Sequence, residues 1–283
     1  MALSYFSEDV GANQELWVTD GTVLGTHVLA GFGFQSVFNL TTIGSRVFFE
    51  ENDNTHGYEL WTSDGTATGT MMVQDIWPGP GDSSPQDLTN VSGTLFFAAN
   101  DSTGDQLWKS DGTAAGTVKV STIDPDDLTN VNGTLYFSAN DGVHGDELWK
   151  SDGTAAGTVM VADINPGALG SDLEFLTNIN GTLYFGANDG THGEELWKSD
   201  GTAAGTVMVK DIYTGAGNSA FPQDLTNVNG ALYFVAGWQR WLSTLEVGWD
   251  RRRNGEGLDD RSRPGSDECQ RHHLLLVQRW RAW

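Results

Sequence analysis

The residues best suited to chemistry in this 283-residue chain lie in a short recurring loop with the pattern Asn-Asp-x-x-His-Gly. Three copies place an acid three positions before a histidine, and these pairs are Asp53–His56, Asp141–His144 and Asp189–His192. Oxygen ligands are what Ca²⁺ prefers in proteins, and Glu194 adds a carboxylate directly after the third copy. We take the three aspartates and Glu194 as candidate calcium ligands, and the three histidines as candidate ligand-binding residues.

Other features of these loops favour an ordinary turn. Their spacing differs from the twelve-residue EF-hand loop, and Asn-Asp-Gly is a frequent turn sequence. The copy at Asn100–Gly104 lacks the histidine. One histidine per unit makes a zinc site only if several units converge.

Aromatic residues in the longer links suggest a second kind of site. Trp77, Tyr213 and Phe221 stand beside Asp, Asn or Gly residues. Aromatic side chains with polar neighbours suit stacking against a carbohydrate. The competing interpretation is that they pack against Gly-Pro turns of the links themselves.

We predict that the chain is not an enzyme. A nucleophile and its base would stand once, in one distinctive loop, whereas the polar residues here recur in every unit. No glycine-rich phosphate loop opens a helix. Carboxylates from different units could still converge, which leaves a glycosidase-type enzyme as a remote alternative.

The bulk composition narrows the classes of partner. A net charge of −23 would repel the phosphates of nucleic acid. No apolar run reaches the length of a transmembrane helix, so membrane insertion is not expected. The segment Met1–Phe6 does not resemble a signal peptide, and Cys269 is the single cysteine.

The elements that position these residues form a repeat. Leu-Trp pairs recur at spacings of 44, 47, 41 and 48 residues, ending at Trp17, Trp61, Trp108, Trp149 and Trp197. One unit contains four extended segments, which are Leu128–Val131, Thr134–Ser138, Glu147–Lys150 and Thr158–Val161. Four strands in 40–50 residues are typical of a β-propeller blade. We predict an all-β propeller of about five four-stranded antiparallel blades, or an incomplete arc of a larger one.

The links between units are the variable part. The spacing from Ile76 to Leu88 is 12 residues, and that from Ile123 to Leu128 is five. In a four-stranded meander, successive connections lie on alternate faces. The Asn-Gly and Ser-Asp-Gly-Thr turns therefore share one face, and the Asn-Asp loops and the links between units share the other. Because binding residues concentrate on such loops, this is the predicted binding face.

The two ends of the repeat depart from its pattern. Ser4–Ser7 matches a second strand, and Asp224–Val235 supplies a first and a second strand. We expect the C-terminal first strand to complete the N-terminal unit, which would leave Leu232–Val235 redundant. The propeller domain is thus placed at residues 1–237.

Residues 238–283 look like a shifted copy of the repeat. Suitable codons for Leu245–Asp250, read one nucleotide later, encode Trp-Lys-Ser-Asp-Gly-Thr. We therefore interpret this tail as a frameshift product that is disordered, and we assign no function to its arginines.

The segments Glu147–Thr158 and Glu195–Thr206, both ELWKSDGTAAGT, resemble the bacterial ELWxxDGT repeat family. Their Ser-Asp-Gly-Thr turns are also similar to the Asp-box turns of sialidases and other propellers. This resemblance implies an extracellular or cell-surface protein and assigns no chemistry. It also implies a structural rather than ligand-binding role for Asp64, Asp111, Asp152 and Asp200.

The sequence therefore predicts a non-catalytic binding module of a bacterial surface or secreted protein. Its expected ligand is a carbohydrate or a protein, bound on the face of the variable links. The alternative is a purely structural repeat array, stiffened by calcium.

Overall fold

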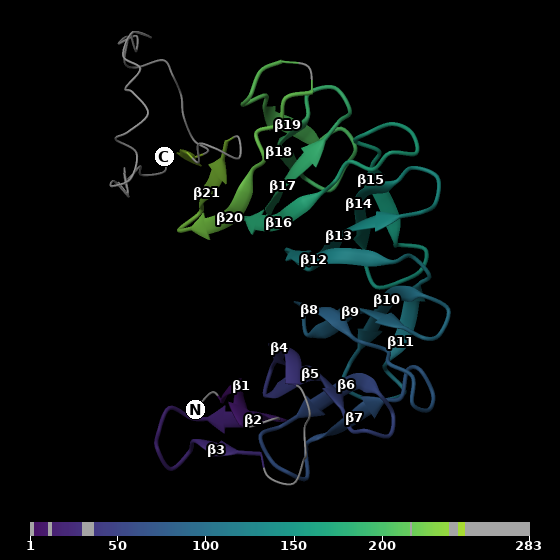
Figure 1. Cartoon of the computed structure of the whole chain (residues 1–283), viewed down its shortest axis with the longest axis vertical. Coiled ribbons are helices and arrows are strands. Elements are labelled where there is room, and N and C mark those ends of the chain that lie inside the picture. The colour runs from purple at the N-terminus through teal and green to yellow at the C-terminus, as the bar shows by residue number, and fades with distance from the viewer. Residues whose placement is uncertain (1–2, 11–12, 30–36, 216, 238–242, 247–283) are drawn as a thin grey trace. The chain divides into compact units, whose positions relative to one another are not determined.

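The fold was analysed in a computed structural model, which describes residues 3–10, 13–29, 37–215, 217–237 and 243–246. This part of the chain contains β-strands and no helix, and hence no helix able to span a membrane. The strands form six antiparallel sheets that follow one another in chain order (Figure 1). We call these sheets blades 1 to 6.

Four of the blades have four strands each. They are blade 2 (β4 Val37–Ile43, β5 Arg46–Asn52, β6 Tyr58–Ser63, β7 Met71–Gln74), blade 3 (β8 Gln86–Val91, β9 Thr94–Asn100, β10 Asp105–Ser110, β11 Val118–Ser121), blade 4 (β12 Pro125–Val131, β13 Thr134–Asn140, β14 Asp146–Ser151, β15 Val159–Ala162) and blade 5 (β16 Glu174–Ile179, β17 Thr182–Asn188, β18 Glu194–Ser199, β19 Val207–Lys210). Three-stranded sheets are blade 1 (β1 Ser4–Val10, β2 Asn13–Thr19, β3 His27–Val28) and blade 6 (β20 Gln223–Val228, β21 Ala231–Ala236, β22 Ser243–Glu246).

The first hairpin of blade 4 is closed by Asn132-Gly133, as the sequence predicts. Both residues have positive φ, 52° and 87°. Two such residues form a type I′ turn, whose twist matches that of the flanking strands. The Asn-Gly pair therefore fixes the register of the first two strands.

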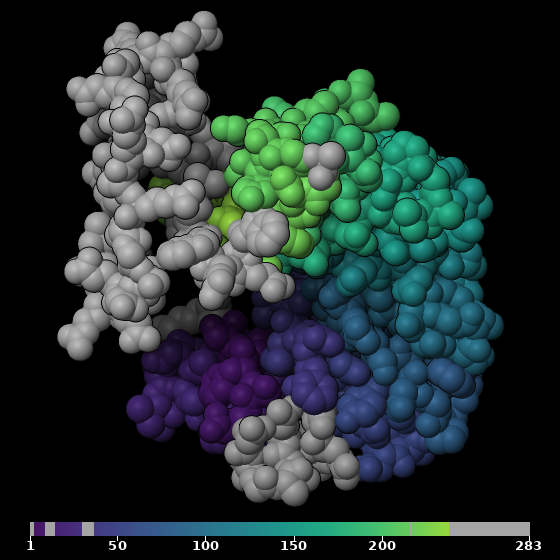
Figure 2. Space-filling model, turned by 45° about the horizontal axis from the view of Figure 1, so that its top comes forward, coloured from purple at the N-terminus to yellow at the C-terminus, as the bar shows by residue number. Residues whose placement is uncertain are grey.

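Neighbouring blades are joined through the repeated Leu-Thr-Asn sequence of their first strands. The Thr89 hydroxyl donates to the Leu128 carbonyl of the next blade at 3.0 Å. In the opposite direction, the Asn130 amide donates to the Asn90 carbonyl at 2.7 Å. Equivalent bonds join blades 4, 5 and 6. The teal and green blades accordingly form a continuous surface in Figure 2.

The signature tryptophans pack between blades. Trp149 is 8% exposed and belongs to a cluster with Phe96 and Leu107 of blade 3 and Phe137 of its own blade. Trp61, Trp108 and Trp197 occupy equivalent clusters. Since burying such a ring is worth a few kcal/mol, the Leu-Trp repeat supplies much of the inter-blade core.

The Ser-Asp-Gly-Thr-x-x-Gly-Thr turn of blade 4 is closed by its own side chains. The Asp152 carboxylate accepts bonds from the N–H and hydroxyl of Thr154, at 2.9 and 2.7 Å. The Thr154 hydroxyl accepts the Gly157 N–H at 3.0 Å. A Cβ on Gly157 would overlap the Asp152 carboxylate, so this position requires glycine. The turns of Asp64, Asp111 and Asp200 repeat these bonds, which supports the structural interpretation of the motif.

Blade 6 corrects the expectation for the chain's ends. β20 pairs with β21 and not with blade 1, so Leu232–Val235 is not redundant. β22 adds to β21 with Leu245 opposite Phe234, the position that the signature tryptophan holds in other blades. Four residues of the tail predicted to be disordered thus form a strand. The rest of that prediction falls on residues outside the described part.

Candidate functional site

The Asn-Asp-x-x-His-Gly loops connect the second and third strands, and each is closed on itself. In blade 4 the Asp141 carboxylate accepts the Val143 and His144 N–H groups at 2.8 and 2.9 Å. Its other oxygen lies 2.7 Å from His144 Nδ1. The pairs Asp53–His56 and Asp189–His192 repeat this arrangement at 2.6 and 2.7 Å. The three aspartates predicted to bind calcium therefore complete their own turns.

The same bonds set the charges of the loop. Hydrogen bonds from the His144 backbone and side chain, and then from Val143, lower the pKa of Asp141 to about 2. The Asp141 carboxylate in turn raises the pKa of His144. The turn is therefore stabilised by an ionised Asp141 carboxylate beside a His144 side chain whose pKa is raised.

The four predicted calcium ligands are not brought together. Asp53, Asp141 and Asp189 lie in three different blades, and Glu194 begins β18. In the described part of the chain, no three His, Cys, Asp or Glu side chains are grouped to hold a metal ion.

Glu194 is a buried acid in an acidic neighbourhood. It is 9% exposed, and its Oε1 atom has no hydrogen-bond partner within the described residues. A Cβ on Gly186 would lie 3.2 Å from this oxygen. Burial, followed by the charges of Glu174 and Asp172, raises the pKa of Glu194 to about 7. Its carboxyl group therefore titrates near neutral pH.

The aromatic residues of the links have different environments. Trp77 packs against its own link, where a Cβ on Gly81 would lie 2.5 Å from the indole ring. Tyr213 and Phe221 both belong to the link between blades 5 and 6, and are 43% and 40% exposed. The three aromatic residues predicted to stack against a carbohydrate thus lie in two different links.

Long links are anchored by the glutamate of the Glu-Leu-Trp motif, a role that sequence reasoning missed. Glu147 is fully buried, and its carboxylate accepts the Ile164 and Asn165 N–H groups at 2.8 and 3.1 Å. Glu59 and Glu195 make the same bonds. Blade 3 has Gln106 at this position, and its amide donates to the Thr103 hydroxyl at 2.6 Å instead.

The long links also cover the start of the third strand. The Ser171 N–H donates to the Asp146 carbonyl at 2.8 Å, and Ser83 makes the same bond to Tyr58 at 2.9 Å. The link between blades 3 and 4 runs only from Ile123 to Leu128. It passes directly into β12 through Asp124, Pro125 and Asp126, without an equivalent covering loop.

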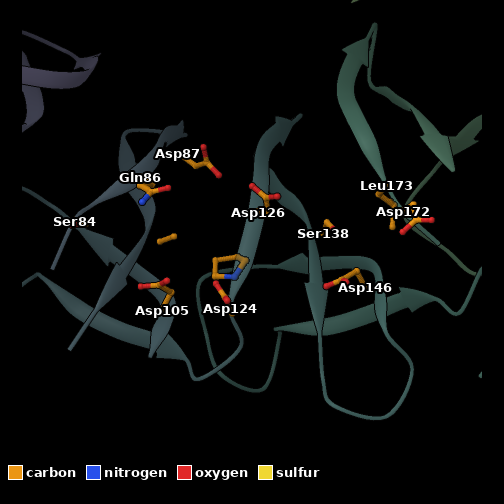
Figure 3. Close-up of a pocket in the computed structure, with 12 residues that line it drawn as sticks. Ser84, Gln86, Asp87, Asp105, Asp124, Asp126, Ser138, Asp146, Asp172 and Leu173 are labelled. Carbon is orange, nitrogen blue, oxygen red and sulfur yellow. The ribbon is translucent and has the colours of Figure 1, made fainter. Parts of the chain in front are cut away.

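A hollow of about 450 Å³ surrounds the start of β12 where this cover is missing. Ser84, Gln86, Ala98, Pro125, Ser138 and Leu173 line it together with six aspartates, and no lysine, arginine or histidine does. These acids are Asp87, Asp105, Asp124, Asp126, Asp146 and Asp172. Figure 3 shows Asp105 and Asp124 on one side of β12, and Asp146 and Asp172 on the other. We call this hollow the acidic pocket.

The acidic pocket carries uncompensated negative charge. Burial, and then the charges of Asp105, Asp126 and Asp146, raise the pKa of Asp124. Burial and the Asp126 charge likewise raise the pKa of Asp87. Clefts lined by one sign of charge concentrate ligands of the opposite sign. The arrangement is suited to binding a cation.

None of the six aspartates was among the site residues predicted from sequence. Two signals in the sequence do point to the acidic pocket. The link from Ile123 to Leu128 is seven residues shorter than the link from Ile76 to Leu88, and Gln106 stands where other units have glutamate.

No family model and no curated protein matches the chain. A solved structure of puromycin hydrolase, an S511A mutant complexed with PGG, is similar with a TM-score of 0.53 and 14% identity, over 87% of this chain and 43% of that one. A structure from a study of two prolyl endopeptidases gives 0.53 and 12%, over 83% and 39%. The chain thus spans less than half of each. At these identities the likeness shows the fold alone, and the prediction of an all-β propeller of four-stranded antiparallel blades is confirmed.

Proposed function

We propose that the chain is a non-catalytic binding module whose ligand site is the acidic pocket. The observation that supports this is the pocket itself, in which six aspartates without a basic neighbour surround the shortest of the links between blades 2 and 6. By contrast, the repeated polar motifs are occupied by the fold. The Asp boxes, the Asp–His loops and the anchoring glutamates all bond to groups of the chain.

The setting of this module is proposed from the repeat sequence. Its resemblance to the ELWxxDGT family supports a bacterial surface or secreted protein in which binding units are repeated. A purely structural array is the alternative function, and it differs in having no ligand that depends on the pocket.

Thermal unfolding with a panel of cationic, neutral and anionic small molecules tests the proposal. Asp105→Asn/Asp146→Asn removes two pocket charges whose carboxylates take part in no hydrogen bond to a described residue. Glu8→Gln/Glu15→Gln is the matched control, because these acids face each other across β1 and β2 in blade 1. We expect cations to raise the Tm of the wild type and the control, and to raise that of the pocket variant less.

Two results would count against a binding module. One is a Tm that responds to no class of compound. The other is a response of equal size in the pocket variant and the blade 1 control, which would indicate general screening of the negative charge.

A further inference from the structure

We infer that the acidic pocket binds an aliphatic polyamine, a methylene chain carrying two or more ammonium groups. This inference rests on the proposed function and specifies its ligand. It is drawn from the distribution of charge, from apolar surface within the pocket and from one hydroxyl group that lines the pocket without a hydrogen-bond partner.

The charges of the pocket are spread along its length. Asp105 and Asp124 lie on one side of β12, and Asp146 and Asp172 lie on the other (Figure 3). Buried Pro125, the first residue of β12, also lines the pocket. A single small cation would leave most of the six carboxylates uncompensated. A linear polyamine can place ammonium groups against acids on both sides of β12, with its methylenes against the apolar lining.

Apolar surface inside the pocket suits the methylenes. Ala98 and Leu173 line the pocket, and both are 8% exposed. The volume of about 450 Å³ falls within the range of about 300–1,000 Å³ found for small-molecule sites. It is larger than a metal ion needs, and the described residues contain no metal-binding cluster.

Ser138 supplies an observation independent of the acids. This residue lines the pocket, is 7% exposed, and its hydroxyl has no hydrogen-bond partner in the described part of the chain. This oxygen is not one of the fully buried unpartnered atoms, so it is open to the pocket. An ammonium group in the pocket would donate to it.

The neighbouring blades show why this place is open. The position of Ser138 is held by Glu50 in blade 2, where the carboxylate accepts a bond from Asn39 at 3.1 Å. In blade 5 it is Gly186, and the longer Glu194 carboxylate lies over it. Blades 3 and 4 instead combine a small residue with a short aspartate. Their acids therefore border an open space rather than fill it.

Calorimetric titration of the whole chain with spermidine at low ionic strength tests the inference. We expect Asp105→Asn/Asp146→Asn to weaken binding about tenfold, since two ion pairs are lost. Glu8→Gln/Glu15→Gln should leave the affinity within about twofold, because these acids do not line the pocket and the effect of distant charges is screened by salt. Ser138→Ala should weaken binding several-fold. We also expect spermidine to bind more tightly than 1,4-diaminobutane, and 1,4-diaminobutane more tightly than 1-aminobutane.

Three outcomes would overturn the inference. Equal weakening in the two double variants would show a diffuse counterion effect. Calcium binding that is tighter than spermidine binding and sensitive to the pocket substitutions would show a metal site. A lysine-rich peptide that binds the pocket and is not displaced by spermidine would leave the proposed function standing and this ligand wrong.

Discussion

The carboxylates of this chain differ in what compensates their charge. Asp152 and Asp141 accept N–H groups of their own turns, and Glu147 accepts those of a link. Asp105 and Glu194 bond to no donor within the described residues. Residue type alone does not show whether a carboxylate already accepts hydrogen bonds. Three of the four acids predicted to bind calcium, Asp53, Asp141 and Asp189, are bonded within their own loops.

Glu194 should make stability depend on pH. The pKa of Glu194 in the folded state is raised from 4.5 to about 7. Its contribution to the free energy of unfolding is therefore fully present below about pH 4.5, and it is lost as the pH rises through about 7. Glu194→Gln cannot ionise, so its free energy of unfolding should fall less than that of the wild type between about pH 5 and 8. The difference should be at most about 3 kcal/mol. Urea unfolding at both pH values measures it.

The exposed Glu8→Gln serves as control and should keep the wild-type slope. An unchanged slope in Glu194→Gln would show that this carboxyl group does not titrate as its surroundings indicate.

Removing calcium should not affect stability. Since the carboxylates of Asp53, Asp141 and Asp189 are bonded within their loops, the Tm should be the same with and without EDTA. Scanning calorimetry makes the comparison. A lower Tm in EDTA, with Asp141→Asn abolishing the effect, would contradict this expectation and support calcium binding by the loops.

At the scale of elements, the links are fixed by single buried residues. Glu147→Ala would leave the Ile164 and Asn165 N–H groups without their acceptor, at a cost of about 2–4 kcal/mol. Gln106→Ala should cost less than about 1.5 kcal/mol, because Gln106 bonds to a Thr103 hydroxyl and anchors no link. Equilibrium urea unfolding of both variants tests this contrast, and equal costs would contradict the anchoring role.

Strands and hairpins were predictable because each copy repeats the same local signals. Asn132-Gly133 specifies its turn by positive φ, and Trp149 marks the third strand by its need for burial. The acidic pocket depends instead on a short link and on which faces of two blades meet. The small side chains of Ala98 and Ser138, which leave it open, form no motif.

At the scale of the whole molecule, blade 6 bears on the frameshift hypothesis. Leu245 takes the place of the signature tryptophan opposite Phe234, and a reading frame shifted by one nucleotide can encode tryptophan at that codon. We predict that the gene encodes Trp-Lys-Ser-Asp-Gly-Thr across Leu245–Asp250 in the shifted frame. Sequencing the coding DNA settles this, and codons that fail to give the repeat would refute it.

We infer that the short link opens a cation-binding pocket, whereas the carboxylates of the Asp boxes, the Asp–His loops and the anchoring glutamates are bonded within the chain. Covering the pocket with the chain's own long link tests this inference. The variant carries the seven residues Asn165–Ser171 inserted between Ile123 and Asp124. Gln106→Glu is added so that a buried carboxylate can anchor the new link, as Glu147 does in blade 4.

Titration of this variant with spermidine is the decisive measurement. We expect an undiminished Tm together with loss of binding, because the inserted link would occupy the place of the ligand. A folded variant that binds spermidine as tightly as the wild type would contradict it.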